Sequence, residues 1–211
     1  MSRPVTLAAL VLVACAALAA GYYLARGKTP SGAPPADGEP RSVVPDVRPV
    51  FALADTDGVR RSITEWDGKP LMINFWATWC PPCRREIPLL NDLQARYGPQ
   101  GFEVIGVAVD FRDDVLAYMR ETPIDYPVLI GEQDGLDAAR AFGMETMGFP
   151  FTVFTDSRGR IVTIHLGELH APQAEVILAA VGDVEAGRLD VEAAQARIRA
   201  TIPPGFGASK N

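Results

Sequence analysis

Residues 71–88 read Leu71-Met-Ile-Asn-Phe-Trp-Ala-Thr-Trp-Cys-Pro-Pro-Cys-Arg-Arg-Glu-Ile-Pro88. In this stretch the pattern of apolar residues changes from that of a strand to that of a helix. The first six residues are a short apolar run, which is the pattern of a central strand buried on both faces. From Arg84 to Tyr97 apolar residues recur at the spacing of one helix face. The stretch therefore predicts a buried strand that leads into a helix, with Cys80 and Cys83 at the junction.

The spacing of Cys80 and Cys83 suits thiol–disulfide exchange. This chemistry needs a thiolate nucleophile with a lowered pKa and a second thiol that resolves the mixed disulfide. At a helix N-terminus the free amides and the helix dipole favour a thiolate at Cys80, and Cys83 lies one turn deeper. We expect Cys80 to attack and Cys83 to resolve, while Pro81 and Pro82 remove amide donors and restrain the loop.

Two other uses of the cysteine pair remain open at this stage. With His165 and His170 the pair could form a zinc site, although the gap between the two pairs is far longer than in a zinc finger. The pair could also be an inert structural disulfide. We expect His165 to be a packed or solvated residue, because no nucleophile lies near it in the sequence.

The rest of the chain predicts an α/β fold with a central mixed sheet flanked by helices. Asp57-Gly58 marks a hairpin turn between Phe51 and Ile63. Further strands are expected at 103–110, 126–130, 151–155 and 161–166. Helices are expected at 113–121, 136–142 and 173–181, and Asp190 can cap another one that continues to about 200.

The N-terminal region predicts export from the cytoplasm. Pro4 to Ala25 carries no charged side chain and, at about 1.5 Å per residue, is long enough for a bilayer core of about 30 Å. We favour an uncleaved signal anchor over lipidation at Cys15 or a cleaved signal peptide. The expected organisation is an anchor or lipoprotein-type signal at 1–26, a flexible linker at 27–42, a folded domain at 43–183 and a helical extension at 184–211.

The block from Asn74 to Pro88 resembles the signature of the TlpA/ResA family, the membrane-anchored thioredoxin-like proteins of bacteria, and cytochrome c maturation thioredoxins share much of it. The resemblance extends from about Arg48 to Val181. It implies a thioredoxin-like fold with an N-terminal β-hairpin near 50–63 and a central α/β insertion near 111–131.

Glu86 is the expected proton carrier of this site. Thioredoxin has a buried Asp where this chain has Asn74, and an amide cannot exchange protons as a carboxylate does. Glu86 lies three residues after Cys83 on the same helix face. In the resembling family a Glu at this position assists proton movement, and burial would raise its pKa. The alternative is a solvated helix carboxylate without a role.

Substrate contacts are expected beside the cysteines. In thioredoxin-like proteins a cis-proline precedes the strand that faces the cysteine motif, and Pro150 matches it by position. We expect Phe149 to make docking more apolar and Trp79 to form an apolar lip, with Pro81 and Pro82 between the cysteines in the same binding surface.

Together these features predict a periplasmic, membrane-tethered reductase of protein disulfides. The expected partners are protein disulfide substrates and, from the resemblance, a membrane thiol donor that supplies reductant. We expect a monomer without cofactor or metal. The net charge of −6 argues against nucleic acid as a partner. The alternatives are a thioredoxin dedicated to cytochrome c or copper-site assembly, and a metal-binding module that is not an enzyme.

Overall fold

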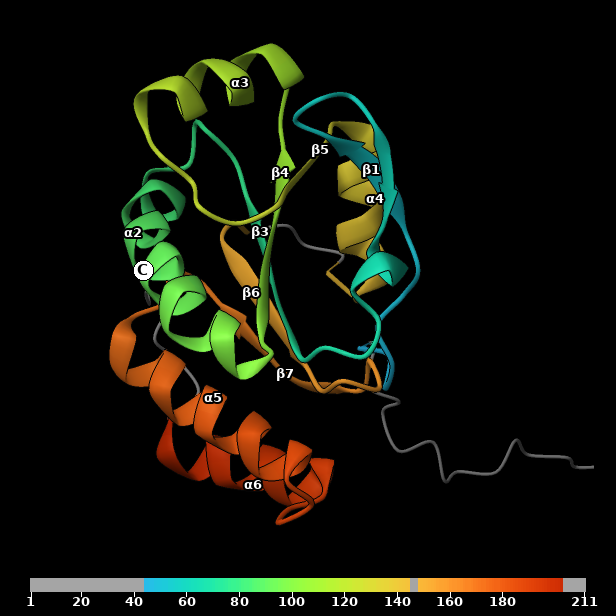
Figure 1. Cartoon of the computed structure of the whole chain (residues 1–211), viewed down its shortest axis with the longest axis vertical. Coiled ribbons are helices and arrows are strands. Elements are labelled where there is room, and N and C mark those ends of the chain that lie inside the picture. Colours follow the sequence, from blue (N-terminus) through green and yellow to red (C-terminus); the bar gives the residue numbers. More distant parts are fainter. Residues whose placement is uncertain (1–43, 145–147, 203–211) are drawn as a thin grey trace, which may run out of the picture. The chain divides into compact units, whose positions relative to one another are not determined.

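A computed structural model describes residues 44–144 and 148–202, through which one mixed sheet runs (Figure 1). Its seven strands in this part of the chain are β1 (Ala52–Asp55), β2 (Arg60–Ser62), β3 (Leu71–Trp76), β4 (Glu103–Val109), β5 (Val128–Gly131), β6 (Phe151–Thr155) and β7 (Ile161–Leu166). Their order in the sheet is β2-β1-β5-β4-β3-β6-β7. The pairs β3–β4 and β4–β5 are parallel and the others antiparallel, which confirms the predicted mixed sheet.

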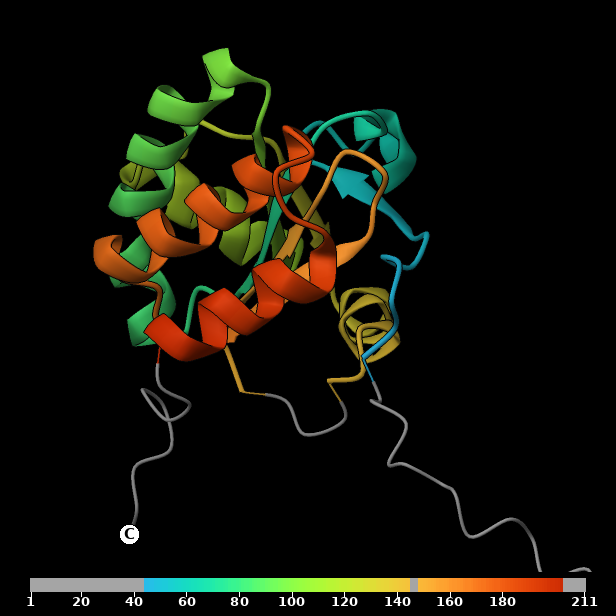
Figure 2. The ribbon, with the colours of Figure 1, turned by 90° about the horizontal axis from the view of Figure 1, so that it is seen from below.

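Helices cover both faces of the sheet. They are α2 (Pro81–Tyr97), α3 (Arg112–Glu121), α4 (Gln133–Ala141), α5 (Ala171–Glu185) and α6 (Val191–Thr201), with 3₁₀ turns at Ile63–Trp66 and Gly98–Gln100. Successive residues of β3 face opposite sides of the sheet. Met72 and Trp76 enter the cluster with α2, α5 and α6, while Ile73 and Phe75 enter the cluster with α4. Figures 1 and 2 show α4 on the side away from α2 and α5.

The N-terminal hairpin forms where the sequence predicts it. The Asp55 carboxylate accepts the amides of Asp57 and Val59, each at 2.9 Å, and so closes the turn between β1 and β2. Gly58 has a φ of 82°, which only glycine adopts without strain. The hairpin joins the sheet through the antiparallel pairing of β1 with β5.

Some element boundaries differ from the predictions, since α4 covers Gln133–Ala141 rather than 136–142 and α5 covers Ala171–Glu185 rather than 173–181. The bounds of β3, β6 and β7 agree with the predicted ones. Helix α2 begins at Pro81, directly after Cys80, which agrees with the prediction that Cys80 lies at the helix N-terminus, and the first turn of a helix tolerates residues without an amide donor. Strand β5 begins at Val128 rather than Tyr126, and Pro127 between them cannot donate to a sheet ladder.

The C-terminal helix α6 packs against α5 and β7 (Figure 2). As predicted, Asp190 caps it by accepting the Ala193 amide at 2.7 Å. Ala194 and Ile198 are buried, and the Gln195 side chain donates through Nε2 to the Ile161 carbonyl on β7 at 3.3 Å.

The expected anchor at 1–26 and the linker at 27–42 lie outside the described residues. Within 44–144 and 148–202, no helix is both long and apolar enough to cross a membrane.

Candidate active site

The two cysteines lie where β3 passes into α2, as predicted, and they are joined as a disulfide. Cys80 is the N-cap residue of α2 with an extended backbone, and Cys83 lies in the first turn. Both are buried, with Cys80 exposed by 3% and Cys83 by 0%. When reduced, a dithiol at this junction can exchange electrons with a substrate disulfide that approaches the N-terminal end of α2.

The first free amide of α2 is directed at the Cys80 sulfur. Pro81 and Pro82 fill the first two helical positions and have no N–H. The Cys83 N–H donates to Cys80 Sγ at 3.3 Å, and the Arg84 N–H donates to the Cys80 carbonyl at 3.2 Å. An amide and a helix dipole directed at one sulfur favour its thiolate, so the structure supports Cys80 as the nucleophile after reduction.

Glu86 is buried on the inner face of α2, and the alternative of a solvated carboxylate is wrong. Its side chain is 1% exposed. One oxygen accepts from Asn74 Nδ2 at 2.8 Å and the other accepts from the Leu169 amide at 2.7 Å. Burial raises the pKa of Glu86 to about 7, against the effect of these two hydrogen bonds, which lower it. Glu86 can therefore hold or release a proton near neutral pH.

A polar row crosses the sheet beneath Glu86. Asn74 on β3 pairs in register with Gly106 on β4 and with Thr152 on β6, and Thr152 pairs with His165 on β7. Asn74 Nδ2 donates to Thr152 Oγ1 at 3.0 Å as well as to Glu86. The side-chain amide of Asn74 thus lies where thioredoxin has a buried acid, and its hydrogen bond holds the Glu86 carboxyl in position.

The connection between β7 and α5 closes the site from the other side, and sequence reasoning missed it. The Gly167 amide donates to the Pro150 carbonyl at 2.8 Å, two residues before the Leu169 amide that binds Glu86. Between them the Glu168 carboxylate accepts from Arg85 on α2 at 2.5 to 3.2 Å. Two of these contacts use main-chain amides, which leave no side-chain signal, but opposite charges at 85 and 168 were visible in the sequence.

The residues expected to bind substrate lie beside the disulfide. The Phe149–Pro150 peptide bond is cis, as predicted. Trp79 is 65% exposed, and its ring lies 6.0 Å from that of Phe149, centroid to centroid. In contrast, Trp76 is fully buried in the core beneath the motif. The exposed Trp79 and the half-buried Phe149 together form an apolar surface next to the cysteines.

The metal-binding alternative finds no ligand set in the described part of the chain. No three His, Cys, Asp or Glu side chains there lie close enough together to hold a metal ion. His165 is buried and its Nε2 lies 3.3 Å from the Glu168 carbonyl oxygen, while His170 is the N-cap residue of α5. Burial lowers the pKa of His165, which agrees with a packed, uncharged residue.

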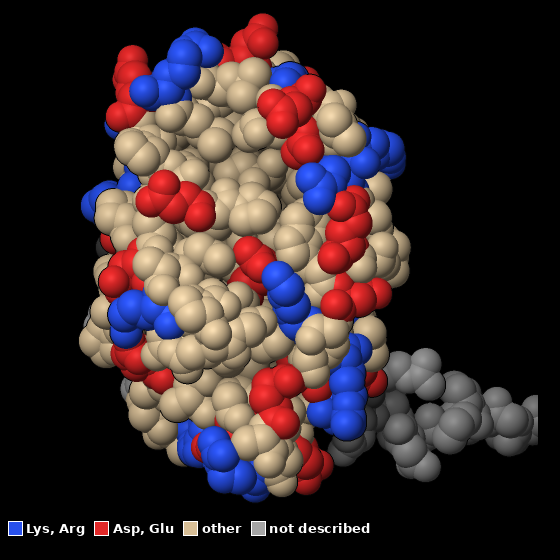
Figure 3. Space-filling view, viewed as in Figure 1, with Lys and Arg blue, Asp and Glu red and all other residues tan. Residues whose placement is uncertain are grey.

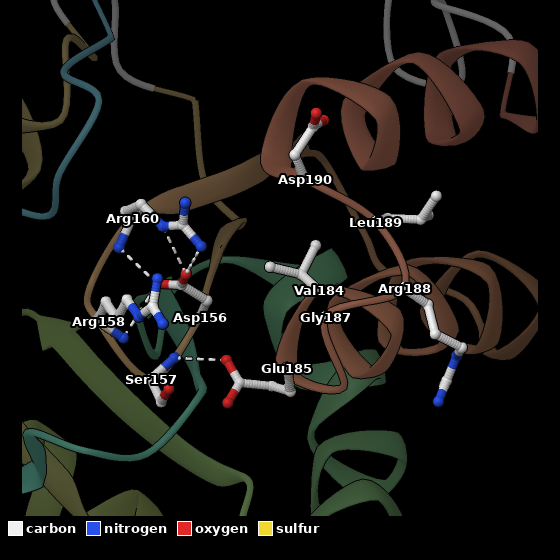
Figure 4. Close-up of a pocket in the computed structure, with 10 residues that line it drawn as sticks. All are labelled: Asp156, Ser157, Arg158, Arg160, Val184, Glu185, Gly187, Arg188, Leu189 and Asp190. Atoms are coloured by element: carbon white, nitrogen blue, oxygen red, sulfur yellow. Dashed lines mark hydrogen bonds and ion pairs between the residues drawn. The ribbon is translucent and has the colours of Figure 1, made fainter.

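A surface pocket lies at the other end of the sheet from the cysteines. The turn between β6 and β7 and the loop between α5 and α6 form its walls (Figure 4). Within it the Asp156 carboxylate pairs with Arg160, and Glu185 accepts the Ser157 amide. Asp156, Arg160 and Glu185 thus already have partners within the protein. Figure 3 shows acidic and basic side chains interspersed on one face, without a large patch of one sign.

Comparisons with known proteins agree with this geometry. A family model described as Redoxin matches residues 39–180. The chain is 33% identical over 122 residues to the thiol-disulfide oxidoreductase ResA of Geobacillus thermodenitrificans, covering 57% of this chain and 68% of the relative. It is 32% identical over 133 residues to the thioredoxin-like protein YneN of Bacillus subtilis, covering 60% and 74%. A solved thiol:disulfide interchange protein of the thioredoxin family from Chlorobium tepidum superposes with a TM-score of 0.52 at 33% identity, covering 59% and 88%.

Proposed function

Because this chain belongs to the Redoxin family, as a thiol–disulfide oxidoreductase of the TlpA/ResA-like group, we propose that it reduces disulfide bonds of proteins outside the cytoplasm. One observation carries the proposal. A buried carboxyl with a pKa of about 7 lies one turn after Cys83, on the helix whose first free amide binds the Cys80 sulfur. This arrangement stabilises an attacking thiolate and provides a proton acceptor for the resolving thiol.

The reaction follows from these positions. The Cys80 thiolate attacks one sulfur of a substrate disulfide and forms a mixed disulfide, and the departing substrate thiolate takes a proton from water. Glu86 accepts the proton of Cys83, whose thiolate then attacks Cys80 Sγ and releases the second substrate thiolate. The dithiol loses two electrons and the substrate gains them, which leaves the Cys80–Cys83 disulfide that the structure contains.

Substrate docking is proposed on the apolar surface that the exposed Trp79 and the half-buried Phe149 form. Trp79 and Phe149 flank the cysteines with their rings in contact, and Pro150 lies beside them at the start of β6. Pro81 and Pro82 complete the surface between the two cysteines. An unfolded or extended polypeptide with apolar residues around its cysteines fits such a surface, because aromatic rings bury large apolar areas on binding.

A variant series tests the reductase. With dithiothreitol as the electron source, the native protein should accelerate insulin reduction, and Cys80→Ser should abolish the acceleration. Cys83→Ser should instead accumulate a mixed disulfide, because its Cys80 thiolate attacks but nothing resolves the product. A Cys80→Ser variant that still reduces insulin overturns the proposal. The protein trapped by Cys83→Ser in cells distinguishes a general reductase from one dedicated to cytochrome c or copper-site assembly.

The proposed location is the periplasmic face of the inner membrane, with a membrane thiol donor as the source of electrons. The uncharged run from Pro4 to Ala25 and the linker after it support this proposal. Cell fractionation should find the native chain in the membrane pellet after alkaline extraction, and deletion of residues 1–26 should release it. A Cys15→Ser variant that stays in the pellet favours an anchor over lipidation. A native chain found in the cytoplasm contradicts the proposed location.

A further inference from the structure

Three buried polar atoms lack a hydrogen-bond partner among the residues that the structure describes: Asn74 Oδ1, Trp76 Nε1 and the Tyr126 hydroxyl. Asn74 and Trp76 are alternate residues of β3 and therefore face the same side of the sheet. Tyr126 belongs to the core cluster on that side, together with Trp76 and Cys83. Buried polar groups are normally satisfied, so three unpaired ones in one region point to a shared partner.

Gly106 on β4 is the place where the Trp76 and Tyr126 side chains meet, next to Asn74. It pairs in register with Asn74. A Cβ atom at this glycine would lie 3.0 Å from Tyr126 Cε2 and 3.2 Å from Trp76 Nε1. The missing side chain of Gly106 thus leaves room for the phenol and the indole to approach the same stretch of backbone.

Tyr126 is held against α2, the helix that carries Glu86. The Asn91 side chain on α2 donates to the Pro123 carbonyl at 3.0 Å and accepts the Asp125 amide at 2.9 Å. These two bonds fix the segment that turns Tyr126 into the core. Burial raises the pKa of Tyr126, and the charge of Glu86 raises it further, so the two groups interact electrostatically.

We propose that Asn74 Oδ1, Trp76 Nε1 and the Tyr126 hydroxyl bind buried water beside Glu86, and that Tyr126 is a positioning residue that fixes this water. A water molecule can both donate and accept hydrogen bonds, so it can bind all three atoms: the indole only donates, the amide oxygen only accepts and the phenol does both. Buried waters typically make about three hydrogen bonds to polar groups that are otherwise unpaired. The inference rests on the proposed function in one respect, the role of Glu86 as the proton carrier.

The consequence for Glu86 has a definite sign. A water that is held by the phenol and orients a hydrogen toward a carboxylate stabilises the charged form of that carboxylate. The other titratable or charged groups around Glu86 are Glu168 with its partner Arg85, His165 across Thr152, and the two cysteines on α2. None of these is changed when only the Tyr126 hydroxyl is removed, so the loss of that hydroxyl should raise the pKa of Glu86.

The test compares Tyr126→Phe with Tyr118→Phe in the disulfide form. Tyr118 also contacts Trp76, at 5.7 Å between ring centroids, and its hydroxyl is not one of the three unpaired groups. Glutamate labelled with ¹³C at the carboxyl carbon reports the titration midpoint of Glu86 by NMR. We expect Tyr126→Phe to move the midpoint upward by about 0.5 to 1 pH unit, the size of one neutral hydrogen bond, and Tyr118→Phe to leave it in place.

A second measurement detects the water directly. In the native protein the Trp76 indole N–H should show magnetisation transfer from a long-lived water, and Tyr126→Phe should weaken the signal. An unchanged midpoint in Tyr126→Phe, or a Trp76 N–H without water contact in the native protein, overturns the inference. Both measurements use the oxidised protein without substrate. A failure of the reductase in the insulin assay is therefore distinguishable from a failure of the water site.

Discussion

At the residue scale, backbone amides govern the two groups that carry the chemistry. The Cys83 amide donates to the Cys80 sulfur, and the Leu169 amide donates to the Glu86 carboxylate. Both bonds favour the charged form of the group that accepts them. At Cys80 the helix start strengthens this effect, whereas at Glu86 burial outweighs it and the pKa rises to about 7. Once the disulfide is reduced, the site therefore favours a thiolate at Cys80 beside a carboxyl that still binds a proton near neutral pH.

Stability should depend on pH through Glu86. Its pKa is about 7 in the folded state against an ordinary value of 4.5, so protonation favours the folded state. The stabilisation is complete below about pH 4.5 and is lost as the pH rises through 7, and the difference corresponds to about 3 kcal/mol. We expect the urea-unfolding free energy of the oxidised protein to fall between pH 5 and 8, and Glu86→Gln to remove most of the fall.

The matched control for this prediction is Glu121→Gln, which changes an exposed carboxylate at the end of α3. It should keep the pH dependence of the native protein. Equal pH dependence in Glu86→Gln and in the native protein would show that the carboxyl of Glu86 titrates near its ordinary pKa.

Trp79 should act in substrate binding and not in folding. Because it is 65% exposed, Trp79→Ala should change the unfolding free energy by less than about 0.5 kcal/mol. Loss of an aromatic contact should lower kcat/KM for a protein disulfide roughly tenfold and leave a small disulfide such as oxidised glutathione unaffected. Val50→Ala, at a 73% exposed residue before β1, is the control. A parallel loss with both substrates contradicts a docking role.

The residues of the local motif could be predicted from the sequence, but the distant residues that contact them could not. Cys80, Cys83 and Glu86 lie on one helix, so spacing alone relates them. Leu169 reaches Glu86 from 83 residues away and through its amide, which any residue type provides. Tyr126 was expected to be an ordinary strand residue, and only the packing of α2 on the sheet brings it near Glu86.

At the scale of the elements, the spacing of apolar residues and the helix-capping residues predicted most helices and strands. Strand β3 is apolar and fully buried, so its bounds were clear from the sequence. The start of β5 was harder to predict, because Pro127 cannot donate to the sheet and the strand begins only at Val128. Asp190 shows the opposite case, in which a capping residue marks the first residue of α6 from sequence alone.

The cap of α6 provides a prediction about stability. Asp190→Ala removes the acceptor of the Ala193 amide, so it should lower the unfolding free energy by about 1 kcal/mol. Asp190→Asn keeps an acceptor and should retain most of that stability. Insulin reduction at 25 °C should be the same in all three proteins. Chemical denaturation followed by circular dichroism measures the difference, and equal stability of the Ala variant would show that the cap contributes nothing.

At the scale of the whole fold, the sheet topology assembles the site. The carboxyl end of β3 carries the cysteines, while antiparallel β6 begins beside it with Pro150 and β7 leads into the segment that binds Glu86. The alternation of strands and helices predicted a mixed sheet, but not the strand order, because pairing joins segments that are distant in sequence. The resemblance to the TlpA/ResA family supplied the thioredoxin-like fold, the hairpin and the insertion in advance.

The reduction potential of the Cys80–Cys83 pair tests the central claim most directly. It can be measured by equilibration of the native chain with dithiothreitol buffers, followed by thiol labelling. A reductase requires a disulfide that is hard to reduce, so we expect a value near that of thioredoxin, about −270 mV. A value near about −120 mV, typical of a strong oxidant, would make the protein a disulfide donor and contradict the account.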